Sequence, residues 1–124
     1  MQKVIICVDD EKIVLNSLQS VLIRKLGKKF DLEFAESAMD ALELIKEYED
    51  QNQISVIISD WLMPKMKGDE FLALVKSTNP AIKAIMLSGQ ADPKAITNAI
   101  SNSWVDHFIQ KPWEEEELIN CILS

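Results

Sequence analysis

The sequence predicts a three-layer α/β/α domain with a central parallel sheet of five strands. Two observations predict it: five short segments of strand character alternate with five segments whose apolar residues recur at helical spacing, and no repeat or linker interrupts the series. Such alternation builds a parallel sheet through right-handed crossovers, with helices on both faces. At 124 residues the chain can form one core without disulfides or metals, so we expect a single domain over residues 1–124.

Composition narrows the class of protein. The formal net charge of −7 argues against direct nucleic-acid binding, because phosphate contacts require Lys and Arg. No apolar run reaches the ~20 residues needed to span a bilayer, so we expect no membrane insertion and a cytoplasmic location. Cys7 and Cys121 lie in apolar surroundings without a paired spacing, which favours reduced core thiols.

The first half of the chain contains two predicted strands and two predicted helices. Residues 3–8 are almost continuously apolar, as suits a strand buried on both faces, and Gly27 is placed to end the helix that follows. Residues 31–36 alternate polar with apolar, which is typical of an edge strand, and Ser37 is the expected N-cap of the second helix. The apolar positions of these helices are Val14, Leu15, Leu18, Val21, Leu22 and Leu26, then Ala41, Leu42, Ile45 and Tyr48.

The third strand is predicted at residues 55–60, where a β-branched run ends on an aspartate. Pro64 and Gly68 mark the loop beyond it, and Asp69 is expected to cap a helix. The polar residues 47–52 before the strand are interpreted as a frayed helix end and a loop. The helix after the strand carries Phe71, Leu72, Leu74 and Val75 on its apolar side.

The last two strands are predicted at residues 84–87 and 105–109. Between them, Asp92-Pro93 opens a helix with a capping residue and a proline in the first turn. Alternation places His107, the only histidine, on the same strand face as Val105 and Ile109, and we favour a packed or surface role for it. Glu114 to Glu117 places negative charge in the first turn of a last helix, where the macrodipole favours it.

Four of the five predicted strands end on groups that can do chemistry. Asp9 and Asp10 follow the first strand, Asp60 ends the third, Ser88 follows the fourth and Lys111 the fifth. The carboxyl ends of parallel strands meet at one edge of the sheet, where open α/β sheets bind their ligands. A single aspartate there would be most simply explained as a turn cap, but this combination predicts a site.

The predicted site favours phosphoryl chemistry on a metal. Three carboxylates repel one another unless a cation joins them, and Mg²⁺ suits oxygen ligands that leave room for a phosphoryl oxygen. Mn²⁺ shares this preference and is a substitute, whereas no Cys/His cluster supports zinc. Lys111 supplies a positive charge for a phosphate oxygen, and Ser88 supplies a neutral donor. Because a carboxylate can itself attack phosphorus, the residues predict phosphoryl transfer onto an aspartate.

At this point the sequence resembles the response-regulator receiver domains of two-component signal transduction, along essentially its whole length. The motifs occur in the family's order and intervals, and together they are highly specific although each is weak alone. They are Val8-Asp9-Asp10-Glu11, Ser59-Asp60 with Met63-Pro64 and Gly68, Leu87-Ser88-Gly89, and Phe108 through Lys111-Pro112.

The resemblance implies a flavodoxin-like fold with strand order 2-1-3-4-5, an order that the pattern alone leaves open. It implies that Asp60 accepts a phosphoryl group from a histidine kinase or a histidine phosphotransfer protein. It also implies that Asp10, Asp60 and the backbone carbonyl of Leu62 hold Mg²⁺, with Asp9 acting mainly through water.

The resemblance further implies how the signal leaves the site. Lys111 and Ser88 would contact the phosphoryl group. The ring of Phe108 would rotate at the same time, and the surface formed by the fourth helix, the fifth strand and the last helix would change its conformation. That surface would meet an effector domain or protein, or a second copy in a homodimer. In the family the bond from Lys111 to Pro112 is often cis.

Two positions depart from the common family pattern. Gly89 stands where alanine is more frequent, which leaves the phosphate more open to water. Phe108 stands where Tyr is also frequent, so the switch ring has no hydroxyl. Both departures concern the lifetime of the phosphorylated form rather than the phosphorylation chemistry.

Two other functions are alternatives to a phosphorylated receiver. An aspartyl-nucleophile phosphatase of the haloacid-dehalogenase type needs a second aspartate two residues after the nucleophile, and that position is Leu62. We therefore expect no enzyme for external substrates, only self-phosphorylation and autodephosphorylation. The other alternative is a receiver-like interaction module that is never phosphorylated. We expect the output to pass to another domain or protein. Trp113 either lies at that contact or covers the end of the core. Lys111-Pro112-Trp113 resembles the ending of receivers joined to HD-type cyclic-dinucleotide phosphodiesterases or built into multi-domain sensor proteins.

Overall fold

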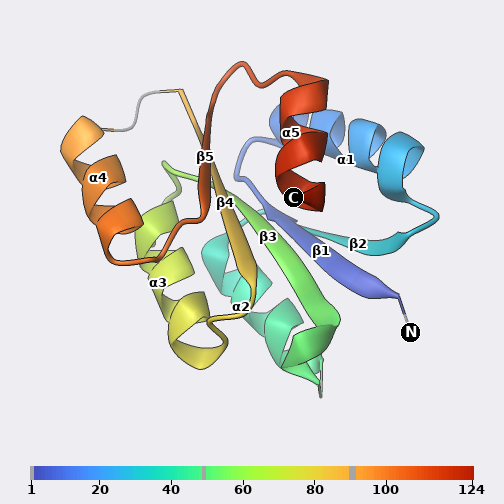
Figure 1. Ribbon diagram of the computed structural model, residues 1–124, viewed down its shortest axis with the longest axis horizontal. Coiled ribbons are helices and arrows are strands. Elements are labelled where there is room, and N and C mark those ends of the chain that lie inside the picture. The colour runs from blue at the N-terminus through green and yellow to red at the C-terminus, as the bar shows by residue number, and fades with distance from the viewer. Residues whose placement is uncertain (1, 49, 90–91) are drawn as a thin grey trace.

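The computed structural model, which describes residues 2–48, 50–89 and 92–124, contains a five-stranded parallel sheet in the order β2-β1-β3-β4-β5 (Figure 1). This confirms the predicted fold and the order that the resemblance implied. The strands are β1 (Lys3–Val8), β2 (Phe30–Ala35), β3 (Ile54–Asp60), β4 (Lys83–Ser88) and β5 (His107–Gln110). The helices are α1 (Lys12–Leu26), α2 (Ala38–Glu47), α3 (Gly68–Thr78), α4 (Pro93–Ser101) and α5 (Glu115–Leu123), with a 3₁₀ turn, η1 (Gln51–Gln53).

Two apolar layers fill the space between the sheet and the helices. Figure 1 shows α1 and α5 on one face of the sheet and α2, α3 and α4 on the other. α1 and α5 cover one face, against Ile5, Ile58 and other side chains that point to that side. α2, α3 and α4 cover the other face, where Phe71 is fully buried. β1, β3 and β4 are buried along nearly their whole length, which explains their continuous apolar runs.

Capping residues fix where several helices begin and end. The Ser37 hydroxyl accepts a hydrogen bond from the backbone N–H of Asp40, and the Asp92 carboxylate accepts one from the N–H of Lys94. Gly27 is the C-cap of α1. These caps confirm the predicted boundaries, and each satisfies a backbone group that the helix leaves unpaired.

Three local predictions were wrong. Asp69 does not cap α3: the helix begins at Gly68 with Lys67 as N-cap, and Asp69 lies in the first turn. The predicted loop at residues 47–52, of which residue 49 lies outside the described residues, ends in the 3₁₀ turn η1 rather than in irregular structure. β5 begins at His107, two residues later than predicted, so Val105 packs with the α2–α4 layer while Ile109 packs with the α1–α5 layer.

The late start of β5 follows from the hydrogen bonds that Asp106 makes with β4 and α3. Its backbone N–H donates to the carbonyl of Ala84 (2.8 Å), and its carboxylate accepts from the N–H of the same residue (2.8 Å). The carboxylate also accepts from Lys76 Nζ of α3 at 2.6 Å. At this point the side chain of Asp106, rather than a backbone carbonyl of β5, therefore pairs with β4, and its bond to Lys76 joins the α4–β5 loop to α3.

Neither thiol has a disulfide partner. Cys7 is fully buried in β1 and Cys121 is half-buried in α5, and both are free. Burial, with the nearby charge of Asp9, raises the pKa of Cys7, so it stays protonated as a core thiol. Among the described residues, no helix is long and apolar enough to cross a bilayer.

Candidate functional site

Three carboxylates meet at the carboxyl edge of the sheet. Asp60 is the last residue of β3, and Asp9 and Asp10 follow β1, the neighbouring strand in the sheet. One carboxylate oxygen from each lies within 4.8 Å of the others. Asp9 is 0 % exposed and Asp60 is 6 % exposed, whereas Asp10 faces solvent. The structure thus brings the predicted acid cluster together.

Lys111 joins two of these carboxylates. Its Nζ donates to Asp60 Oδ1 at 2.9 Å and to Asp9 Oδ2 at 3.1 Å. The backbone places it there, because the N–H of Lys111 donates to the carbonyl of Ser88 and so extends the pairing of β5 with β4 by one residue. The peptide bond from Lys111 to Pro112 is cis.

The charges of the cluster shift the pKa values of both partners. Burial raises the pKa of Asp60, and the charge of Asp9 adds to this, so the hydrogen bond from Lys111 offsets only part of the increase. Burial by itself lowers the pKa of Lys111, but the contacts with Asp60 and Asp9 outweigh it and the pKa is raised. Lys111 therefore remains an ammonium, and the site holds two buried acids against one fixed positive charge.

The donor set fits a hard divalent cation. The three carboxylates offer oxygen ligands only; two of them are buried and one is exposed. The ammonium of Lys111 neutralises only one of their negative charges. Mg²⁺ and Mn²⁺ prefer such ligands and keep part of their water shell. The arrangement is therefore suited to one such ion beside Asp60.

A cleft of about 320 Å³ opens over Asp60. Its lining is Glu11, Asp60, Leu62, Ser88, Gly89 and Lys111. The side chain of Leu62 is 53 % exposed at the rim, and Ser88 is buried. Sequence reasoning did not propose Glu11 as part of the site, although its place directly after the acid pair was a signal that could have found it.

The loop after Asp60 is held close to the strand by Gly68. The Gly68 N–H donates to the carbonyl of Trp61 (2.9 Å), and a Cβ at Gly68 would lie 2.2 Å from the backbone oxygen of Asp60. No side chain fits there, so the loop approaches the strand only because residue 68 is glycine. Trp61 and Met63 are both buried beneath this loop, which confirms that they pack against the protein.

The remaining predicted residues lie outside the acid cluster. Phe108 is half-buried in β5 against the α2–α4 layer. Trp113 is half-buried against the α1–α5 layer and also lines a surface groove with Ile13 and Pro112. His107 lies with its Nε2 3.3 Å from the Ser124 hydroxyl, far along the strand from the cluster.

A family model of the response regulator receiver domain matches residues 5–123. The chain belongs to this family. It is therefore a receiver domain of the two-component response regulators, as the sequence motifs indicated.

Individual relatives agree with the family. Chemotaxis protein CheY of Listeria monocytogenes is 30% identical over 101 residues, which cover 82% of this chain and 83% of that relative. The hydrogenase transcriptional regulatory protein HoxA of Cupriavidus necator is 31% identical over 121 residues, covering 98% of this chain and 23% of that protein. The chain thus spans about a quarter of this longer relative.

Solved structures give the same picture. The signal receiver domain of an HD domain-containing protein from Pseudomonas fluorescens Pf-5 superposes with a TM-score of 0.88 at 29% sequence identity. The alignment covers 99% of this chain and 93% of that one. The similarity therefore extends over the sheet and all of its helices.

Proposed function

We propose that this receiver domain is a phosphorylation-operated switch in which Asp60 accepts a phosphoryl group. The observation that carries the proposal is the position of Asp60: a strand-end carboxylate at the floor of the cleft, grouped with Asp9 and Asp10 and bonded to Lys111. The donor is a histidine kinase or a histidine phosphotransfer protein, in keeping with the family. Residues 1–124 act as one receiver unit.

The transfer is an attack by a carboxylate oxygen of Asp60 on the phosphorus of a phosphohistidine. A new O–P bond forms while the P–N bond breaks, and the electron pair of that bond returns to the imidazole nitrogen. Lys111 lies beside the attacking oxygen, so its ammonium compensates charge on the phosphoryl oxygens. The Ser88 hydroxyl donates a hydrogen bond to the transferred group.

A bound Mg²⁺ would neutralise the phosphoryl oxygens and orient them for in-line transfer. Asp10, Asp60 and the backbone carbonyl of Leu62 would hold it, with Asp9 acting through water. The exposure of Asp10 supports this division, because Asp9 is buried and already accepts hydrogen bonds from Lys111 and from the N–H of Glu11. Mn²⁺ would substitute at the same ligands.

The phosphodonor is proposed to dock over a groove that adjoins Lys111. This groove, of about 390 Å³, lies between the start of α1 and the β5–α5 loop and is lined by Ile13, Val14, Ser17, Lys111, Pro112 and Trp113. Ile13 is 82 % exposed, which is unusual for so large an apolar side chain and suits a contact with a partner. Trp113 would be the aromatic anchor of this contact.

The output is proposed to pass through α4, β5 and α5 to an effector domain or protein, with self-association through the same surface as one form of it. Ser88 lines the cleft at the end of β4, and Phe108 lies on the neighbouring strand β5, which is part of that surface. Longer relatives such as HoxA carry the receiver within a larger regulator, which supports an effector as the partner. The protein acts in the cytoplasm and turns over no external substrate.

The deciding experiment is incubation with acetyl phosphate and Mg²⁺ followed by intact mass. The wild type should gain one phosphoryl group, and Asp60→Asn should gain none. Asp31→Asn is the matched control, because Asp31 is an exposed aspartate on the edge strand β2, and it should behave as the wild type. A full gain in Asp60→Asn would overturn the assignment, and no gain in the wild type would favour the unphosphorylated module.

The docking part has a separate test. Trp113→Ala should slow transfer from a phosphorylated histidine phosphotransfer protein while leaving acetyl phosphate chemistry unchanged, since the small donor needs no docking surface. If the variant only loses stability and accepts phosphate from both donors at wild-type rates, Trp113 is a core residue.

A further inference from the structure

A second groove lies on the opposite face of the sheet, between α3 and the α4–β5 loop. It measures about 540 Å³, and its lining combines apolar side chains with two carboxylates: Met66, Asp69, Glu70, Ala73, Leu74, Ser77, Asn98 and Trp104. Met66 and Trp104 are half-buried there, and Leu74 of α3 is 46 % exposed although it is a large apolar residue. The groove is separate from the cleft over Asp60, with which it shares no lining residue.

The backbone holds the aromatic wall of this groove in place. Ser103, just beyond the end of α4, has φ 62, and its N–H donates to the carbonyl of Ile100 while the N–H of Trp104 donates to that of Ala99. These two bonds form a Schellman motif, which ends a helix with the following residue folded back onto it. The groove is thus preformed, and a ligand would not need to order its wall.

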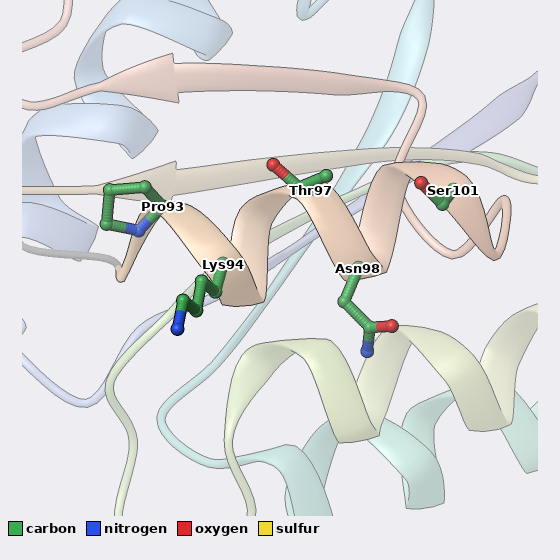
Figure 2. A pocket seen from close by; sticks show the side chains of 5 residues that line it. All are labelled: Pro93, Lys94, Thr97, Asn98 and Ser101. Atoms are coloured by element: carbon green, nitrogen blue, oxygen red, sulfur yellow. The ribbon is translucent and has the colours of Figure 1, made fainter.

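The charged residues that line the groove are both acidic. Asp69 and Glu70 line the end nearest the start of α3, and no Lys or Arg is among the lining residues. Lys76, the cation further along α3, already binds Asp106 at 2.6 Å and is not part of the lining. Lys94 of α4 lies on the side of the helix that also carries Asn98 (Figure 2). Among the ion pairs of the described residues, none joins Lys94 to Asp69 or Glu70.

The hollow on the outer side of α4 has a different character. Figure 2 shows Asn98 directed toward α3, whereas Thr97 lies on the other side of the helix. That hollow is lined by Pro93, Lys94, Thr97, Asn98 and Ser101, without any large apolar side chain other than the proline ring. Of these two hollows beside α4, the one on the α3 side therefore offers an apolar anchor the better surface, at Leu74 and Trp104.

We infer that the groove between α3 and the α4–β5 loop binds a basic amphipathic segment of a partner protein. An apolar side chain of that segment packs against Met66, Leu74 and Trp104, and a neighbouring Lys or Arg pairs with Asp69 or Glu70. Two carboxylates without a cation in the lining select a basic partner, and the apolar side chains supply the contact area. The inference is independent of whether Asp60 is phosphorylated.

The test uses a fluorescent model helix of Leu and Lys, with leucines at i, i+3, i+4 and i+7 spacing, and its counterpart in which Glu replaces every Lys. Anisotropy titration of the intact domain should show saturable binding of the Lys peptide and none of the Glu peptide. Leu74→Ser and Glu70→Lys should each weaken binding about tenfold or more, because each removes one of the two contacts.

Two matched variants separate the groove from general attraction to an acidic protein. Glu43→Lys makes the same charge change on an exposed position of α2, and Leu123→Ser removes an exposed leucine from α5. Both should bind the Lys peptide within about twofold of the wild type. If the peptide does not bind, or if Glu43→Lys weakens it as much as Glu70→Lys does, the groove is not a docking site.

Discussion

Replacing Gly68 by alanine should destabilise the protein more than any other single methyl group added near the site. The new Cβ would lie 2.2 Å from the backbone oxygen of Asp60, 3.1 Å from its carbonyl carbon and 3.2 Å from the Cα of Trp61. Ordinary carbon–oxygen contacts lie at about 3.3 Å or more, so the chain must separate by roughly 1 Å. All three neighbours are backbone atoms, and no change of rotamer relieves the overlap.

The magnitude follows from three effects. Forcing an extra methyl group into packed surroundings costs about 1–3 kcal/mol. The hydrogen bond from the Gly68 N–H to the Trp61 carbonyl is stretched by the same movement, with a loss of about 0.5–1.5 kcal/mol. Alanine recovers up to about 1 kcal/mol because Gly68 opens α3, where glycine is unfavourable. The mid-range values of these three effects sum to a destabilisation of about 2–3 kcal/mol, or a melting temperature lower by roughly 6–18 °C.

Thermal and urea unfolding, followed by circular dichroism, would measure this directly. Gly89→Ala is the matched control, since its Cβ would meet only the Cβ of Lys111 at 3.8 Å, an ordinary contact. The control should unfold within about 0.5 kcal/mol of the wild type. Because the displaced carbonyl belongs to Asp60, Gly68→Ala should also accept phosphate more slowly. A Gly68→Ala variant as stable as Gly89→Ala would refute the close-approach argument.

Three further predictions concern the same edge of the sheet. Asp10→Ala should weaken Mg²⁺ binding more than Asp9→Ala, measured by titration of tryptophan fluorescence, and equal affinities would remove the division of roles between them. Lys65, with φ 70, should be replaceable by glycine with a gain of about 0.5–1 kcal/mol in urea unfolding, because the left-handed conformation disfavours a side chain; a loss of stability would contradict this. Ser88→Ala should still accept phosphate but show smaller NMR shift changes in residues 94–123 on phosphorylation, and an unchanged response would exclude its hydroxyl as the link.

Periodicity predicted the architecture because each buried strand must be apolar on both faces and each helix on one. The strand order came from the motifs of the family rather than from the pattern, since apolar runs do not identify their neighbours. The parts that failed were decided by single contacts at the ends of elements. Asp106 illustrates this. The alternation of residues 105–109 predicted that β5 begins at Val105, but the Asp106 carboxylate accepts the hydrogen bond from the Ala84 N–H, and the strand begins only at His107.

Much of the candidate site could be predicted from which strands end on polar residues. Parallel topology alone brings Asp9, Asp10 and Asp60 to one edge, and the structure places them within 4.8 Å. The same argument brings Lys111 to this edge, but not its contacts with both Asp9 and Asp60, which depend on the side-chain conformation. The close approach of Gly68 could not be derived either, because it depends on how the loop after β3 returns to the strand. The α3 groove was also beyond the sequence, since nothing in the pattern showed that Leu74 would be left uncovered.

The bridge made by Lys111 has a consequence for when the protein can be folded. A carboxylate as deeply buried as that of Asp9 would destabilise the folded state if it had no positive partner. Lys111 of the same chain supplies that partner. Folding should therefore not require a divalent ion, and the domain would already be folded before the proposed metal binds. Under the proposed function, a chelator should abolish phosphorylation while changing the melting temperature very little. In Lys111→Ala, the chelator should lower both the phosphorylation and the melting temperature.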